Sequence, residues 1–291
     1  MQKIEASELV LNSKNNVYHL DLSPEEIANT VILVGDPGRI KLIESVMDSV
    51  DIRRTNREIC TITGTYKGKR VSAISTGMGT DNTDIVVTEL DILCNVDLNK
   101  KELKDTHKSL NLIRLGTCGA MQPEVEIDNY VISEYALGLD GMAYFYDIPE
   151  DVFVNTLSDA VKKHTDWSDS LPNIYAVKAS KVLEEKFDDQ KFYKGITLTA
   201  PGFYGAQGRA IRLPLKYPKL NESFMSFNYK NYKIANYEME TSALYAIGQS
   251  LGHNTLTACV AIANRATNKF SSNYENAMLN LIEYTFNSIL E

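Results

Sequence analysis

Five short segments carry glycine or polar residues with arginine, hydroxyl or carboxylate groups, and the first has the composition of an anion site. Gly35-Asp-Pro-Gly-Arg39 follows the apolar run 31–34 and precedes a predicted helix over 40–50. Unpaired backbone N–H groups at a helix N-terminus attract anions, and the guanidinium of Arg39 is a planar fork of donors for phosphate or carboxylate. An ordinary strand-to-helix turn with a surface arginine is the alternative.

The other four segments also stand at or near the ends of predicted strands. They are Ser75–Gly79, Arg114–Gly119, Tyr237–Glu240 and Ile262–Arg265. Because open α/β sheets bind ligands at the carboxyl ends of their strands, we expect the five segments to meet at one site. Each segment also has a structural interpretation: Thr117 as a helix cap, Glu238 and Glu240 as first-turn acids, and Arg265 as a surface charge.

The elements that must position these segments alternate along the chain. Apolar runs predict strands over 31–34, 70–75, 112–115, 130–133, 195–199, 233–237 and 255–261. Helical periodicity predicts helices over 40–50, 84–96, 241–251 and 274–290. Strands that alternate with helices favour an α/β fold with a central sheet. The chain has no internal repeat or Pro/Gly/Ser-rich linker, so we expect a single domain over 1–291.

Two polar stretches predict excursions from this framework. Residues 99–109 are highly charged and are expected to form a solvated surface insertion. Residues 216–233, rich in Tyr, Phe, Asn and Lys, are expected to form a second surface excursion.

Composition excludes several classes of protein. The formal net charge of −8 argues against a nucleic-acid-binding protein, which normally has a basic face. The sequence lacks an apolar run of transmembrane length, and its N-terminal residues lack the pattern of a secretory signal. The four cysteines are scattered without a CxxC pair, which favours reduced thiols over disulfides or a zinc site. We therefore expect a cytoplasmic protein without membrane or nucleic-acid partners.

The ordered motifs resemble the nucleoside phosphorylase-I superfamily. Gly35–Arg39, Ser75–Gly79, Arg114–Gly119 and Tyr237–Glu240 occur in that family's order. Within the family, Phe203-Tyr-Gly-Ala-Gln-Gly-Arg209 resembles the base-recognition loop of uridine phosphorylases, and Val17–Leu20 and Arg57-Glu58 match as well. The resemblance implies a three-layer α/β/α fold around a central mixed, partly barrel-like sheet.

The resemblance also implies an activity and a set of site residues. The activity is reversible phosphorolysis of uridine to uracil and ribose 1-phosphate in pyrimidine salvage, through an oxocarbenium-like transition state. The implied phosphate-binding residues are Gly35, Arg39, Arg57, Arg114 and Thr117. The implied ribose-binding residues are His19, Cys118, Glu238, Met239 and Glu240. The implied base-binding residues are Phe203, Gln207, Arg209, Tyr237 and Ile262. Arg114, Arg209 and Glu240 are the implied catalytic residues.

The base loop predicts the substrate class. The amide of Gln207 matches the N3–H and O2 edge of uracil, and Arg209 is expected to donate to O4. Purine-specific relatives typically have an aspartate after the last core strand, whereas Ala261–Arg265 contains no acid. Cys118 replaces the hydroxyl residue usual in uridine phosphorylases, which puts ribose contacts and the discrimination of 2′-deoxy substrates in question.

The resemblance implies an oligomer with shared sites. Tyr18, His19 and Arg57 would reach the site of a neighbouring subunit, in a homodimer or in a hexamer built as a trimer of dimers. No organic cofactor is expected, and inorganic phosphate is a co-substrate. Glu58 matches the acid that binds interfacial potassium in some relatives, although Asn82 replaces the usual serine.

Two alternatives stay open. One is a purine nucleoside phosphorylase or a nucleosidase of the same superfamily. The other, from a different class, is a catalytically silent nucleoside-binding protein.

Overall fold

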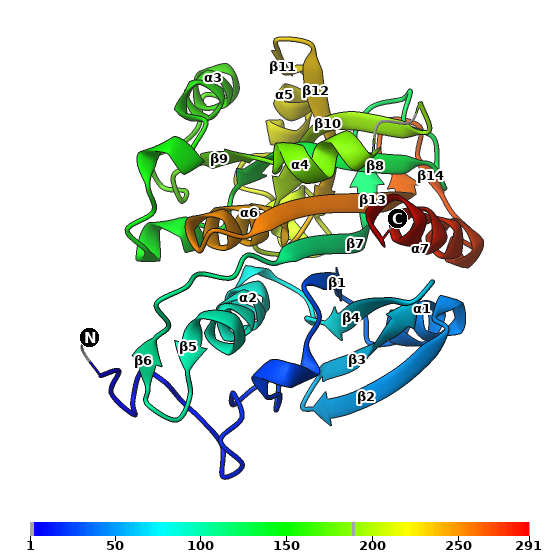
Figure 1. The fold of residues 1–291 in the computed structure, drawn as a ribbon. Coiled ribbons are helices and arrows are strands. Elements are labelled where there is room, and N and C mark those ends of the chain that lie inside the picture. The colour runs from blue at the N-terminus through cyan, green and yellow to red at the C-terminus, as the bar shows by residue number, and fades with distance from the viewer. Residues whose placement is uncertain (1–2, 188–189, 291) are drawn as a thin grey trace.

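The computed structural model describes residues 3–187 and 190–290 and is built on a mixed sheet of twelve strands (Figure 1). Along the chain these are β1 (Thr30–Val34), β2 (Ser49–Asn56), β3 (Ile59–Tyr66), β4 (Lys69–Ser75), β7 (Asn111–Ala120), β8 (Tyr130–Gly138), β9 (Tyr175–Lys178), β10 (Phe192–Thr199), β11 (Asn228–Tyr229), β12 (Tyr232–Glu238), β13 (Asn254–Asn264) and β14 (Lys269–Phe270). The main path runs β11-β12-β10-β8-β13-β7-β1-β4-β3-β2, with β14 on β13 and β9 on β8. A separate hairpin joins β5 (Val96–Asp97) to β6 (Glu102–Leu103).

Part of the sheet closes into a barrel. Strand β12 pairs with β10 on one side and, through Asn236 and Tyr237, with Ala120 and Gly119 of β7 on the other. The ring β7-β13-β8-β10-β12 is thereby complete, and β1, β4, β3 and β2 extend from it as an open wing. Parallel pairs dominate around β1 and β7, whereas β13 with β8 and β12 with β7 are antiparallel. The expected mixed, partly barrel-like sheet is confirmed.

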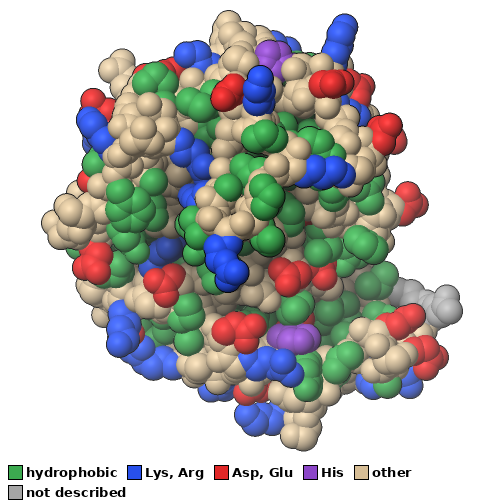
Figure 2. Space-filling model, turned by 180° about the vertical axis from the view of Figure 1, so that it is seen from behind, with side chains coloured by type: hydrophobic (Ala, Val, Ile, Leu, Met, Phe, Trp, Pro, Cys, Tyr) green, Lys and Arg blue, Asp and Glu red, His purple; other side chains and the backbone are tan. Residues whose placement is uncertain are grey.

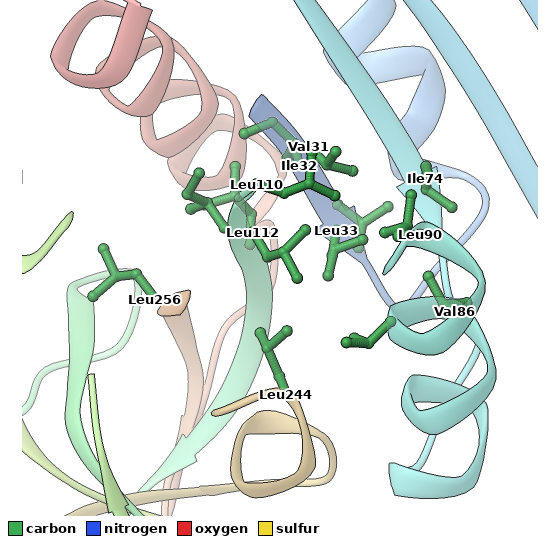
Figure 3. Packing of buried hydrophobic residues seen from close by; sticks show 14 of the residues in the cluster. Val31, Ile32, Leu33, Ile74, Val86, Leu90, Leu110, Leu112, Leu244 and Leu256 are labelled. Atoms are coloured by element: carbon green, nitrogen blue, oxygen red, sulfur yellow. The ribbon is translucent and has the colours of Figure 1, made fainter. Parts of the chain in front are cut away.

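The helices cover the sheet. They are α1 (Arg39–Val46), α2 (Thr80–Asn95), α3 (Asn155–Thr165), α4 (Lys181–Glu184), α5 (Leu220–Ser226), α6 (Thr241–Ser250) and α7 (Glu275–Leu290), with short 3-10 turns between them. Helices α2 and α6 pack against each other. Figure 3 shows the apolar layer beneath them, where Leu33 of β1, Leu90 of α2 and Leu244 of α6 are fully buried or nearly so. This burial fixes the strand ends that present the motifs.

Some predicted boundaries were wrong. The helix expected over 40–50 ends at Val46, because Ser49 and Val50 already pair with Thr65 and Gly64 of β3. The strand expected to stop at residue 115 continues to Ala120, so Arg114–Gly119 lies inside β7 rather than after it. Strand β7 pairs with β13 over 111–120, with β1 over 111–114 and with β12 at Gly119 and Ala120. Glycine is needed at position 116, because a Cβ there would meet the side chains of Arg114 and Cys259.

The two polar stretches differ in outcome. Between 99 and 109 every side chain is at least partly exposed, and the stretch contains β6. The surface excursion expected over 216–233 is confirmed only in part. All its side chains except Phe224 and Phe227 are at least partly exposed, but the stretch contains α5 and β11 and inserts these two phenylalanines into an apolar cluster. Its alternation of aromatic and polar residues is that of elements buried on one face. In the part of the chain that the structure describes, no helix is long and apolar enough to cross a membrane.

Candidate active site

A cavity of about 430 Å³ lies where the motif-bearing segments meet. Thirteen of the predicted site residues line it: Gly35, Arg39, Arg114, Thr117, Cys118, Phe203, Gln207, Arg209, Tyr237, Glu238, Met239, Glu240 and Ile262. Asp36, Pro37, Gly77, Met78, Gly119, Ala263 and Phe270 complete the lining. A larger, mainly apolar cavity of about 730 Å³ adjoins it and shares Arg209 and Tyr237.

Two arginines form the cationic end of the cavity. Arg39 donates from Nη1 to the Leu115 carbonyl and from Nη2 to Thr117 Oγ1, each at 3.3 Å. Burial and the nearby charge of Arg114 lower the pKa of Arg39. Among the described residues, the buried Nε atoms of Arg39 and Arg114 have no hydrogen-bond partner. Buried donors without acceptors, on two adjacent cations, define a region that favours an anion.

Arg114 is held by two carboxylates. Its Nη2 donates to Glu240 Oε2, and its Nη1 lies 3.3 Å from Glu238 Oε2 and 3.4 Å from Cys259 Sγ. Burial alone would lower the pKa of Arg114, but Glu240 and Glu238 outweigh burial and raise it. The guanidinium is therefore charged and fixed in orientation at the boundary between the anion end and the rest of the cavity.

Glu238 is a positioning residue in this geometry. Thr199 Oγ1 donates to its Oε1 at 2.6 Å, and the backbone N–H groups of Glu240 and Thr241 donate to its Oε2 at 2.9 and 3.0 Å. Its carboxylate thus binds N–H groups at the start of α6 and also faces Arg114, although Glu238 ends β12 and is not in the first turn of the helix, where the structural interpretation placed it. Burial and the charge of Glu240 raise the pKa of Glu238, whereas Arg114 opposes them.

Glu240 presents a carboxylate at the centre of the cavity. Beyond Arg114, its Oε1 accepts the backbone N–H of Gly79 at 2.8 Å. Gly79 has φ 100°, a conformation that residues with a side chain rarely adopt. A glycine is therefore required at position 79, in the motif Ser75–Gly79, for this N–H to point at Glu240. That motif therefore orients a carboxylate here.

The loop Phe203–Arg209 lines another part of the cavity. Gln207 is buried, and its Oε1 accepts from Arg209 Nη1 at 2.7 Å and from Arg265 Nη2 at 3.2 Å. The guanidinium of Arg209 also lies 3.8 Å from the centre of the Phe203 ring. Burial and the charge of Arg265 lower the pKa of Arg209 to about 10, so it stays protonated at neutral pH. Two cations thus fix which end of the Gln207 amide is the oxygen.

Sequence reasoning missed three supporting residues. Arg265 belongs to a segment that was expected at the site, but no role was assigned to it; it contacts Gln207 and lies 5.1 Å from the Tyr237 ring centre. Thr199 ends a correctly predicted strand, but nothing in its residue type marks it as a partner of Glu238. Asn221, in the stretch expected at the surface, donates to the Gln207 carbonyl and accepts from the Tyr237 hydroxyl. Only the tertiary structure reveals these contacts.

The residues expected to serve a neighbouring subunit lie together outside this cavity. Arg57, in the turn between β2 and β3, is 5.6 Å from the Tyr18 ring centre, and Asn56 Nδ2 donates to the carbonyls of Tyr18 and His19. His19 Nδ1 is 2.7 Å from Glu89 Oε1. Glu58 is exposed in the same turn. These side chains form one surface cluster on their own chain.

Comparison with known proteins identifies the family of this chain. Residues 29–288 match the phosphorylase superfamily. The chain is 30% identical over 276 residues to a uridine phosphorylase of Thermococcus kodakarensis, covering 93% of this chain and 85% of the relative. It is 29% identical over 274 residues to a DeoD-type purine nucleoside phosphorylase of Bacillus cereus, covering 94% and 95%.

The fold agrees as well. A crystal structure of a Trypanosoma brucei nucleoside phosphorylase, described as showing uridine phosphorylase activity, superposes with a TM-score of 0.87 at 28% identity and covers 97% of this chain and 99% of that one. The chain belongs to the phosphorylase superfamily, and the family resemblance seen in the sequence is confirmed.

Proposed function

We propose that this protein is a pentosyltransferase that converts uridine and phosphate reversibly to uracil and ribose 1-phosphate. The supporting observation is that one cavity is lined both by the unpartnered donors of Arg39 and Arg114 and by the Gln207–Arg209 loop. The similarity to the Thermococcus kodakarensis uridine phosphorylase and to the Trypanosoma brucei enzyme supports uridine as the nucleoside. A role in cytoplasmic pyrimidine salvage fits this reaction.

Phosphate would bind at the cationic end. Arg39, Arg114 and Thr117 present donors there, and Gly35 lines the same wall. A dianion would take up the free Nε donors and screen the repulsion between the two guanidinium groups. Phosphate would then lie next to Glu240, which we assign to the sugar, so that an oxygen nucleophile is placed near the anomeric carbon.

The sugar would lie against Glu240 and Met239. The Glu240 carboxylate can accept hydrogen bonds from the ribose hydroxyls, and its negative charge stabilises positive charge that develops on the sugar ring. Cys118 lines this part of the cavity, where its thiol replaces a hydroxyl and is a weaker hydrogen-bonding group. Glu238 acts indirectly, by orienting Arg114 and the start of α6.

Uracil would replace a hydrogen bond that Gln207 and Arg209 form with each other in the free site. In the free site, guanidinium donors occupy Gln207 Oε1, and Arg209 covers one face of the Phe203 ring. The N3–H of uracil is also a donor, so its binding displaces Arg209 from that oxygen and leaves Arg209 to donate to O4. A cation at O4 stabilises the negative charge on departing uracil. Tyr237 and Ile262 complete the base site.

We further propose that Tyr18, His19 and Arg57 complete the site of a neighbouring subunit, in a dimer or a trimer of dimers. Their grouping on one surface, outside their own chain's cavity, supports this assignment. We also propose that the chemistry needs no organic cofactor. Glu58 is close to Gly77 and Asn82 at this rim, which is where an interfacial potassium ion would bind if the relatives' pattern holds.

The first experiment measures uracil release from uridine with and without phosphate, with inosine in parallel. Phosphate-dependent release from uridine, and none from inosine, is expected. Cleavage of inosine would instead favour the purine phosphorylase activity of relatives such as the Bacillus cereus enzyme. Release without phosphate would indicate a nucleosidase, and cleavage of neither nucleoside would indicate a silent binding protein.

Two arginine variants test the proposed base end and the proposed phosphate end of the site separately. Arg209→Ala is expected to lower kcat/KM for uridine by about 10²–10³-fold, because it removes a charge partner of the leaving group, with little change in phosphate affinity. Arg114→Ala should instead weaken the binding of phosphate more than the binding of uridine. Steady-state kinetics with each substrate varied in turn distinguish them, and equal loss of both affinities in Arg209→Ala would contradict its assignment to the base.

A further inference from the structure

A cluster of metal-ligating side chains lies outside the candidate active site. Asp91 of α2, His107 of the 99–109 stretch and His253 in the turn between α6 and β13 each contribute a ligand atom, and these atoms lie within 4.8 Å of one another. None of the three lines the catalytic cavity. The cluster therefore needs an explanation apart from the phosphorylase reaction.

His253 is the buried member of the cluster. Its side chain is 0% exposed, and its Nε2 is 3.3 Å from Asp91 Oδ1 but makes no hydrogen bond to any described residue. A buried imidazole nitrogen without a hydrogen-bond partner is costly unless another group binds there. His107, at the exposed end, is the side from which such a group can arrive.

We propose that Asp91, His107 and His253 bind a divalent transition-metal ion of the zinc type. Two imidazole nitrogens and one carboxylate are a ligand set that zinc accepts, with water in the fourth position. Ligand atoms at about 2.0–2.1 Å from a tetrahedral ion lie about 3.3 Å apart, which is the separation of Asp91 Oδ1 and His253 Nε2. His107 is on an exposed stretch and can close the remaining distance.

Neighbouring groups already orient two of the ligands. Asn95 Nδ2 donates to Asp91 Oδ1 at 2.6 Å. His107 Nε2 is 2.8 Å from the Leu251 carbonyl and must donate to it, so Nδ1 keeps its lone pair for a metal. The His107 and His253 rings are stacked, with centres 6.0 Å apart. Metal-binding histidines commonly donate their second ring N–H to a carbonyl in this way.

Metal binding would also cost His253 a hydrogen bond. His253 Nδ1 accepts the Leu110 N–H at 3.2 Å, which places the ring proton on Nε2 in the metal-free protein. A metal at Nε2 moves that proton to Nδ1 and breaks the Leu110 bond. The ion thus exchanges one local hydrogen bond for a cross-link between α2, the 99–109 stretch and the α6–β13 turn. Its role is structural, and it restrains the stretch.

The test uses tag-free, chelator-treated protein titrated with Zn²⁺ by calorimetry and with Co²⁺ by visible absorption. Wild type is expected to bind about one ion per chain, with cobalt bands of tetrahedral intensity. His107→Ala, at an exposed position where folding is not at risk, should bind at least about 10-fold more weakly. Asp91→Asn should weaken binding similarly.

His164→Ala is the matched control, because His164 is an exposed histidine that contacts Ser223 and Ser226 away from the cluster. Its metal affinity should equal that of wild type, and zinc should raise the melting temperature of both but not of His107→Ala. Equal affinity in His107→Ala and wild type, or no binding by wild type at about 1 mM metal, would overturn the proposal.

Discussion

At the scale of single residues, charge partners decide what each motif can do. Glu238 and Glu240 face Arg114 and offset the cost of burying its charge, whereas Arg39 has no carboxylate within ion-pair distance among the described residues, so an incoming anion would stabilise it. Burial costs a charged group more than one hydrogen bond returns. This balance of charges supports our assignment of phosphate to Arg39 and of a cationic sugar to Glu240.

The pH dependence of kcat/KM in Thr199 variants tests this balance of charges. Its hydroxyl donates to the Glu238 carboxylate, which favours the charged form of Glu238. Glu238 loses its charge as the pH falls through its raised pKa, and Arg114 then loses a partner. Thr199→Val should raise that pKa further, moving the acid limb of kcat/KM to higher pH by about one unit. Thr199→Ser should restore the wild-type profile, and an unshifted limb in Thr199→Val would contradict the positioning role.

At the scale of elements, the entry into α2 fixes the sugar carboxylate. Strand β4 ends at Ser75, and the turn through Gly79 starts α2 while its N–H binds Glu240. Strand β12 ends at Glu238, and that residue caps α6. The two strand-to-helix turns therefore meet through the bond from the Gly79 N–H to Glu240, whereas Glu238 accepts backbone N–H groups of its own turn.

Gly79→Ala tests the first turn. A Cβ there would meet Asp81 Oδ1 at 2.6 Å in a backbone conformation nearly restricted to glycine, at a cost on the order of 1–3 kcal/mol. We expect a lower melting temperature together with a loss of kcat/KM, because relief of the strain would turn the N–H of residue 79 away from Glu240. Gly68→Ala is the control, since Gly68 also has positive φ but an open surrounding, and it should leave kcat/KM unchanged.

At the scale of the whole molecule, the barrel carries the cavity and the open wing carries the Tyr18–His19–Arg57 cluster, which we propose serves a neighbouring subunit. Strands β2 and β3 project Arg57 at the end of the wing, distant in sequence from the base loop. Figure 2 shows acidic and basic side chains interspersed over one face of the molecule, without the broad basic region of a nucleic-acid-binding surface. The wing is thus suited to complete a site in another copy.

Complementation tests this sharing. Arg39→Ala and Arg57→Ala should each have little activity alone. In co-expressed mixed dimers, one site regains both arginines, so about a quarter of wild-type activity is expected after random pairing of equal amounts. Activity no greater than the average of the two variants would show that Arg57 does not act across an interface.

The sequence by itself determined the residue types at the cavity and the class of fold. Apolar runs of period two or 3.6 and glycine-rich turns are local properties, so β1, β4, α6 and α7 could be predicted closely, and the motifs that end or interrupt them formed one cavity. The barrel closure of β12 on β7 was not visible in this way, because pairing between distant strands depends on the complete sheet. The same is true of the contacts of Arg265 with Gln207 and of Thr199 with Glu238, and of the position of His107 beside Asp91 and His253. These contacts join residues far apart in sequence, and only the packing of the whole chain brings them within a few ångströms.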